Sequence, residues 1–202
     1  MIRHGQSTAN ATGVWQGQLD FPLSEEGREQ ARRTGLALAE EKVSGFYSSP
    51  LLRAFETARI IAREKDYPGD VNPVPGLMER QGGILEGTTR QEREASNPLL
   101  VRKLAGLPEE EQWPLVGAET DEEVLMRFSE ALAGIRSHHA PGDRILVVSH
   151  GGAMRAFLRD LFGDGILPGS ERTPNTSVTR IRCNPDGGKP ELLDLASTQH
   201  LL

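Results

Sequence analysis

Apolar residues recur at helical spacing in three separate parts of the 202-residue chain. Residues 24–38 carry small apolar side chains on one face after a serine, and both 51–62 and 121–135 repeat an apolar stripe. This spacing is typical of helices with one buried face. The run 145–148 is instead continuously apolar, as expected for a strand that is buried on both faces.

Shorter apolar runs predict further strands at 45–49, 178–183 and 192–195, and prolines make 71–74 a short edge strand. Strands and helices therefore alternate, which predicts an α/β fold. We expect three layers, α/β/α, with a mostly parallel central sheet and helices on both faces. Residues 4–23 show no periodicity and predict a loop. The length suits a single domain over 1–202.

Residues 76–120 interrupt this alternation. The first part, 77–89, is rich in glycine and charge, and the stretch up to Trp113 predicts short helices interrupted by prolines. We expect this region to be an insertion that covers one end of the sheet and determines substrate specificity.

Three polar clusters directly follow predicted strands: Arg3-His4-Gly5, Ser48-Ser49 leading to Arg53, and Ser149-His150-Gly151. In parallel sheets, ligands gather beyond the carboxyl ends of the strands. Guanidinium groups stay charged and match the oxygens of a phosphoryl group. We therefore predict a phosphate site built from Arg3, Arg53 and a protonated His150. The Gly151 N–H, at a helix start, would add a backbone donor. This chemistry requires no metal and no other cofactor.

These clusters resemble the signature of the histidine phosphatase superfamily, which has the phosphoglycerate-mutase-like fold. Six blocks follow in the family's order over nearly the whole chain: 3–7 with Asn10, 48–58, 77–80, 117–120, 148–152 and 175–177. A single Arg-His-Gly tripeptide is weak evidence, whereas six ordered blocks are specific. The resemblance implies a phosphomonoester hydrolase that acts on small phosphorylated metabolites.

The first block supplies the predicted nucleophile, His4. Its ring must be neutral to attack, so one nitrogen should donate to a backbone carbonyl, and the family pattern implies that of Gly5. Attack on phosphorus forms phosphohistidine, which water then cleaves, and two easier displacements replace one difficult step. Since such a histidine normally stands at the end of a rigid strand, we expect the natural protein to begin before Met1, with its first strand truncated here.

The leaving alkoxide needs a proton, and the attacking water must later lose one. A single carboxyl group can do both in turn. The resemblance places the family's acid at Glu79, with Glu86 as the alternative from the same loop. Arg80 is a predicted contact for a substrate carboxylate or second phosphate, and Asn10 and Gln16 are predicted secondary contacts to the phosphate or its leaving group.

A phosphoglycerate mutase that depends on a bisphosphoglycerate cofactor is the alternative within the family. Such mutases typically carry Trp-Asn after the first motif and a longer insertion, whereas residues 7–10 here read Ser-Thr-Ala-Asn and 79–119 is short. Glu79-Arg80 together with residues 83–87 nevertheless resembles the mutase acid block, with Glu86 where a glutamine is usual. A third alternative is a catalytically weak member that serves as a phosphate-binding or scaffold module.

Composition narrows the choice of partners. The formal net charge of −6 and a pI of about 5.5 argue against nucleic acid or an anionic membrane as the main partner. The single cysteine, Cys183, excludes an intrachain disulfide and fits the cytoplasm. The sequence leaves open whether the protein forms a homodimer. His138 and His139 point apart on a helix and predict a helix end, not a metal site.

Overall fold

The computed structural model describes residues 1–166, 173–184 and 187–202 around a six-stranded sheet. In chain order the strands are β1 (Ile2–Arg3), β2 (Gly45–Ser48), β3 (Asn72–Pro73), β4 (Ile145–Ser149), β5 (Val178–Arg182) and β6 (Glu191–Ser197). They lie in the order β3-β2-β4-β1-β5-β6. The first four in this order pair in parallel, whereas β5 and β6 are antiparallel. The mostly parallel sheet and the edge position of 71–74 are confirmed.

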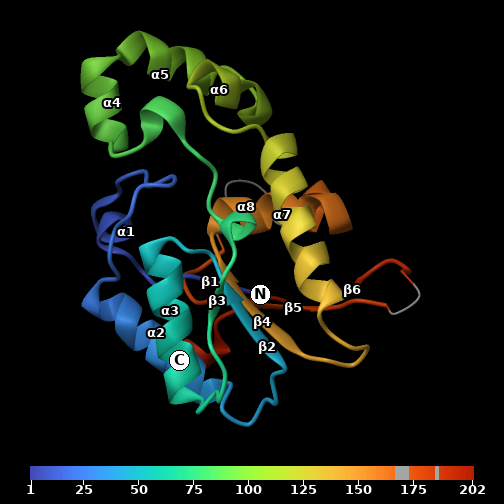
Figure 1. Ribbon diagram of the computed structural model, residues 1–202. Helices are drawn as coiled ribbons and strands as arrows, with labels where there is room; N and C mark the ends of the chain where they lie inside the picture. Colours follow the sequence, from blue (N-terminus) through green and yellow to red (C-terminus); the bar gives the residue numbers. More distant parts are fainter. Residues whose placement is uncertain (167–172, 185–186) are drawn as a thin grey trace.

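Helices cover both faces of the sheet (Figure 1). The helices α2 (Glu25–Ala37) and α3 (Leu52–Glu64) pack on one face, and α7 (Asp121–Ser137) and α8 (Gly151–Phe162) pack on the other. Along β4, Val147 belongs to the second core and Val148 to the first. The continuous apolar run therefore reflects a strand buried on both sides, and the three-layer α/β/α prediction is confirmed.

Several local predictions need correction. The predicted loop 4–23 contains a short helix, α1 (Thr8–Thr12), because Ser7 and Asn10 form a capping box that periodicity cannot reveal. Thr120, just before the predicted stripe 121–135, caps α7 through a second such box with Glu123. The helix α3 begins at Leu52, two residues after Pro50.

The region 76–120 forms the predicted short helices, which lie together at the top of Figure 1. They are α4 (Arg90–Ser96), α5 (Pro98–Ala105) and α6 (Glu109–Leu115), after the 3₁₀ turns η1 (Pro75–Leu77) and η2 (Gly83–Leu85). Leu85, Trp113 and Val116 form a small core there with Trp15 from the N-terminal loop. Two further 3₁₀ turns, η3 (Asp164–Ile166) and η4 (Gln199–Leu201), follow α8 and β6. None of the helices in the described ranges is long and apolar enough to cross a membrane.

Candidate active site

Parallel pairing brings His4 and His150 together at the ends of neighbouring strands. Arg3 in β1 lies opposite Ser149 in β4, so the next residue of each strand is a histidine. Their ring centroids are 5.1 Å apart, and both rings are buried. The strand register alone therefore explains why two histidines 146 positions apart share one site.

His4 has the hydrogen bonding that a histidine nucleophile needs. Its Nδ1 lies 2.7 Å from the Gly5 carbonyl oxygen, and because a carbonyl only accepts, Nδ1 carries the proton. The lone pair is left on Nε2. Burial and the charges of Arg53 and Arg3 hold the pKa of His4 well below its usual range, so the ring is neutral at pH 7.

A threonine that sequence analysis missed fixes the backbone beside His4. Thr57 Oγ1 accepts the Gly5 N–H at 2.9 Å and donates to the Arg53 carbonyl at 2.6 Å. Gly5 has no room for a side chain, since a Cβ there would lie 2.5 Å from the Gly27 carbonyl oxygen. Thr57 belongs to the 48–58 block, so the sequence marks it as a candidate, but the sequence does not show that it binds the Gly5 N–H.

The two predicted arginines lie beside the histidine pair. Arg53, in the first turn of α3, is almost fully buried and is one source of the lowered pKa of both His4 and His150. Its terminal nitrogens donate to the carbonyls of Gly17, at 2.7 Å, and Leu19, at 2.9 Å. Arg53 Nε is buried and has no hydrogen-bond partner in the described part of the chain. The guanidinium thus holds the N-terminal loop beside the site.

Arg3 and Gly151 lie next to each other beside the histidine pair. Arg3 is buried and donates to the Thr173 carbonyl, and Gly151 opens α8 immediately after His150. A Cβ on Gly151 would lie 3.4 Å from Arg3 Nε. The predicted helix start after His150 is confirmed, and its first residue lies next to the arginine.

Glu79 lies at the N-terminus of α8. Its carboxylate accepts the N–H groups of Gly152, at 3.0 Å, and Ala153, at 2.9 Å, and that of Arg80, at 2.9 Å. Arg127 supports the same segment from α7 by donating to the carbonyls of Met78, at 2.7 Å, and Glu79, at 2.9 Å. Sequence analysis did not assign this positioning role to Arg127.

Glu86 is used differently. One of its oxygens accepts the N–H groups of Gly82, at 2.7 Å, and Gln18, at 2.9 Å. The same oxygen lies 1.9 Å from where a Cβ of Gly17 would be, and Gly17 has a φ of +52° that favours glycine. Glu86 therefore ties the N-terminal loop to the 79–87 segment.

The side chain of Arg80 points into the packing of the insertion. It donates to the Glu119 carbonyl and to the Asp121 carboxylate, and its guanidinium lies 4.3 Å from the centre of the Trp113 ring. The structure therefore places Arg80 between α6 and the start of α7. Its guanidinium donates to groups of the protein itself, and the predicted substrate contact stays a prediction.

Asn10 and Gln16 are both held through their carbonyl ends. Asn10 Oδ1 accepts the Ser7 N–H at 3.2 Å and the Asn175 amide at 3.4 Å, and Gln16 Oε1 accepts the Ser7 hydroxyl at 2.7 Å. This orientation leaves the NH₂ group of each side chain as the donor for a ligand. The predicted contacts to phosphate stay predictions.

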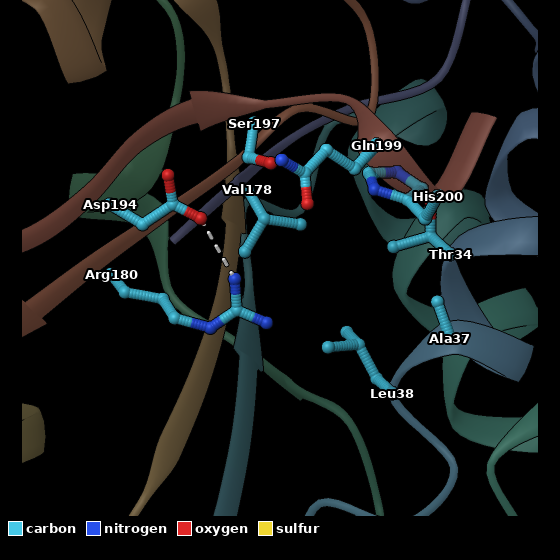
Figure 2. A pocket seen from close by; sticks show the side chains of 9 residues that line it. All are labelled: Thr34, Ala37, Leu38, Val178, Arg180, Asp194, Ser197, Gln199 and His200. Atoms are coloured by element: carbon cyan, nitrogen blue, oxygen red, sulfur yellow. Dashed lines mark hydrogen bonds and ion pairs between the residues drawn. The ribbon is translucent and has the colours of Figure 1, made fainter. Parts of the chain in front are cut away.

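A cavity beside α2 and the helix end at His138 involve none of the predicted site residues. A cavity of about 160 Å³ lies between α2 and the β5–β6 pair, lined by residues that include Thr34, Arg180 and His200 (Figure 2). Among the described residues, no group of three or more His, Cys, Asp or Glu side chains has a geometry for a metal. His138 caps the C-terminus of α7, which confirms the predicted helix end.

Comparison with known proteins identifies the family. Residues 1–196 match the histidine phosphatase superfamily, branch 1. The chain belongs to this superfamily. It is 38% identical over 205 residues to phosphoglycerate mutase-like protein 4 from Arabidopsis thaliana, covering 100% of this chain and 85% of that protein. It is 36% identical over 157 residues to a metal-independent phosphoserine phosphatase from the same organism, covering 77% of this chain and 65% of that protein.

A solved structure supports the same assignment. The phosphoserine phosphatase mutant from Entamoeba histolytica, in complex with phosphoserine, superimposes with a TM-score of 0.77 and 26% identity, covering 100% of this chain and 97% of the other. The phosphoglycerate-mutase-like α/β fold implied by the six blocks is therefore confirmed. Relatives named as phosphatases and as mutases both occur, and the phosphatase interpretation fits best.

Proposed function

We propose that this superfamily member hydrolyses small phosphomonoesters through a phosphohistidine intermediate on His4. The observation that carries the proposal is the buried histidine pair, whose ring centroids are 5.1 Å apart. His4 donates through Nδ1 to the Gly5 carbonyl, which leaves Nε2 as the nucleophilic atom. Arg3 and Arg53 beside the pair supply positive charge for a phosphoryl group.

The proposed reaction proceeds in two displacements. His4 Nε2 forms a bond to phosphorus while the bond from phosphorus to the ester oxygen breaks, and a protonated Glu79 gives its proton to the leaving alkoxide. Water then attacks phosphorus, Glu79 takes a proton from it, and the nitrogen–phosphorus bond breaks. Three backbone N–H groups hold the Glu79 carboxylate at the start of α8, so that one carboxyl group can serve both steps.

The structure favours Glu79 over Glu86 as the proton carrier. Glu86 accepts the N–H groups of Gly82 and Gln18 and so connects the N-terminal loop to the 79–87 segment. The Glu79 carboxylate instead contacts the first turn of α8, which begins at Gly151 directly after His150. The charges of both glutamates act on Arg53, and that of Glu79 acts more strongly than that of Glu86.

Arg80 weighs against the mutase alternative. A phosphoglycerate mutase must hold a substrate carboxylate as well as the transferred phosphate, and Arg80 is the predicted residue for that second group. Its guanidinium is instead bound to Glu119 and Asp121 and stacked on Trp113. The scaffold alternative gains no support either, because the histidine pair, both arginines and Glu79 are all in place.

The decisive experiment measures hydrolysis of p-nitrophenyl phosphate and of a panel of phosphorylated metabolites, beside phosphoglycerate mutase activity with 2,3-bisphosphoglycerate. We expect hydrolysis, little isomerisation, and a loss of about 10⁴-fold or more in the His4→Ala variant, since a covalent nucleophile is lost. An active His4→Ala variant contradicts the mechanism. Fast isomerisation with little hydrolysis establishes the mutase instead.

The remaining proposals concern the surroundings of the enzyme. We propose small phosphorylated substrates as its ligands, with neither nucleic acid nor membrane as a partner, because its net charge of −6 opposes binding to anionic surfaces. The cytoplasm stays the proposed location and a homodimer the alternative to a monomer. Sedimentation of the purified chain decides the oligomeric state.

A further inference from the structure

A buried serine contacts the second histidine of the site. Ser49 follows β2, and Ser48 pairs with Val148 in β4, so Ser49 lies beside the strand end from which His150 projects. The Oγ of Ser49 is 2.8 Å from Nε2 of His150, and both side chains are inaccessible to solvent.

The neighbouring backbone determines which atom of this contact donates. The Leu51 N–H points at Ser49 Oγ from 3.3 Å, so the serine oxygen already accepts one hydrogen bond. A hydroxyl has a single hydrogen to give, and among the described residues His150 Nε2 is the one acceptor within hydrogen-bond distance of it. Ser49 therefore donates, and His150 Nε2 accepts with its lone pair.

The other nitrogen of His150 must then carry the ring proton. His150 Nδ1 is buried and has no hydrogen-bond partner within the described ranges, and its ring lies beside that of His4, with the two planes tilted by 55°. Burial, Arg53 and the neighbouring His4 hold the pKa of His150 well below its usual range, so the ring is neutral at pH 7. The protonated His150 expected from the sequence is not favoured in this structure.

We propose that Ser49 is a positioning residue that fixes the neutral tautomer of His150 in which Nδ1–H donates to the phosphoryl group. The inference rests on the proposed function for the identity of that ligand, but the tautomer itself does not depend on it. In the opposite tautomer Nδ1 would present a lone pair to an anionic oxygen, and the two would repel each other. Ser49 thus makes His150 a phosphate donor without a positive charge on the ring.

Activity of three variants tests the consequence for catalysis. Ser49→Ala removes the hydroxyl, Ser49→Thr keeps it, and Ser48→Ala is the matched control, because Ser48 is equally buried and donates to the Ser49 carbonyl rather than to His150. We expect Ser49→Ala to lower kcat on p-nitrophenyl phosphate by about 10- to 100-fold, as loss of a positioning contact does. Ser49→Thr should restore most of this loss, and Ser48→Ala should show none of it.

Nitrogen NMR of the histidine-labelled protein tests the tautomer directly, and a His150→Gln variant identifies the signals of His150. We expect Nδ1 protonated and Nε2 unprotonated in the wild type and in Ser48→Ala, and a mixture of both tautomers in Ser49→Ala. A proton on Nε2 or on both nitrogens of the wild type overturns the proposal, as does an unchanged tautomer in Ser49→Ala. If the wild type hydrolyses no ester, the proposed function fails while these spectra still decide the role of Ser49.

Discussion

The strand ends and the insertion over 76–120 use their titratable side chains in opposite ways. At the strand ends, His4 keeps its Nε2 lone pair, and His150 Nδ1 has no hydrogen-bond partner in the ranges that the structure describes. In the insertion and at its border, Arg80 and Glu119 are bound to protein groups, to Asp121 and Arg127 respectively. The strand ends present reactive atoms, whereas ion pairs stabilise the insertion.

This contrast teaches how the two regions divide the work. Register fixes the histidine pair, and a buried strand is a rigid support for groups that must meet a phosphoryl group within tenths of an ångström. The insertion is held by ion pairs and a small core around Trp113. Glu79 is the exception, since it reaches from the insertion to the start of α8.

The largest effect is expected from the two glutamates. Glu79→Gln should lower kcat on an alkyl phosphate by about 10²- to 10⁴-fold, because the alkoxide loses its proton donor. The loss on p-nitrophenyl phosphate should be much smaller, since nitrophenolate leaves without a proton. Glu86→Gln should affect both substrates equally through the loop contacts of Gly82 and Gln18. Steady-state rates on the two esters test this, and an equal loss for Glu79→Gln contradicts its role.

A comparison of two buried arginines comes next. Arg53→Lys should lower kcat/KM by about 10²- to 10³-fold, because a lysine cannot hold both the Gly17 and Leu19 carbonyls and keep the same charge beside the histidine pair. Arg80→Lys should leave kcat/KM nearly unchanged and lower the free energy of unfolding by about 1 to 3 kcal/mol, since the contacts to Asp121 and Trp113 weaken. Kinetics and urea denaturation of both variants measure this. An Arg80→Lys variant with normal stability and impaired substrate binding restores the role first predicted for it.

A single glycine offers a sharper test of where Glu79 must lie. A Cβ on Gly152 would lie 2.6 Å from Glu79 Oε1, so Gly152→Ala should push the carboxylate away from α8. We expect a loss of up to about 10²-fold on alkyl phosphates, as for other small misplacements of a catalytic group. Gly134→Ala on α7 is the control, because nothing lies within 4 Å of its added Cβ. Equal rates for the two alanine variants show that the position of the Glu79 carboxylate at the start of α8 is irrelevant to catalysis.

The smallest effect concerns stability against pH. The pKa values of His4 and His150 in the folded protein lie below the ordinary 6.5, so the unfolded chain binds more protons between those values. The free energy of unfolding should therefore fall as the pH drops below about 6.5, by at most about 1.4 kcal/mol per pH unit for each ring. Denaturation between pH 7 and 5 measures the slope, which should be shallower in His150→Gln. An equal slope in that variant shows that His150 does not contribute to the pH dependence of the free energy of unfolding.

Local sequence signals predicted the sheet and its catalytic strand ends because these follow from short-range pattern. The apolar run of β4 leads directly into His150, and any parallel neighbour places its own following residue beside it. The capping boxes of α1 and α7 were harder, since Ser7 and Thr120 act through backbone geometry rather than periodicity.

Contacts between distant segments could not be predicted in this way. The serine hydroxyl of Ser49 meets a histidine 101 positions away, and Arg80 meets an aspartate 41 positions away. Residue type shows that a guanidinium seeks an anion, but only the packing shows whether that anion belongs to the protein or to a substrate. This is why the sequence placed Arg80 with the ligand, whereas the structure pairs it with Asp121.

The central claim is the covalent intermediate on His4, and trapping it is the most direct test. The enzyme is mixed with p-nitrophenyl phosphate, quenched in base during turnover, digested, and analysed by mass spectrometry. One phosphoryl group on the peptide that contains His4, absent in His4→Ala, is the predicted result. Continued hydrolysis with the phosphoryl group on another residue, or with no labelled peptide under conditions that preserve phosphohistidine, contradicts it.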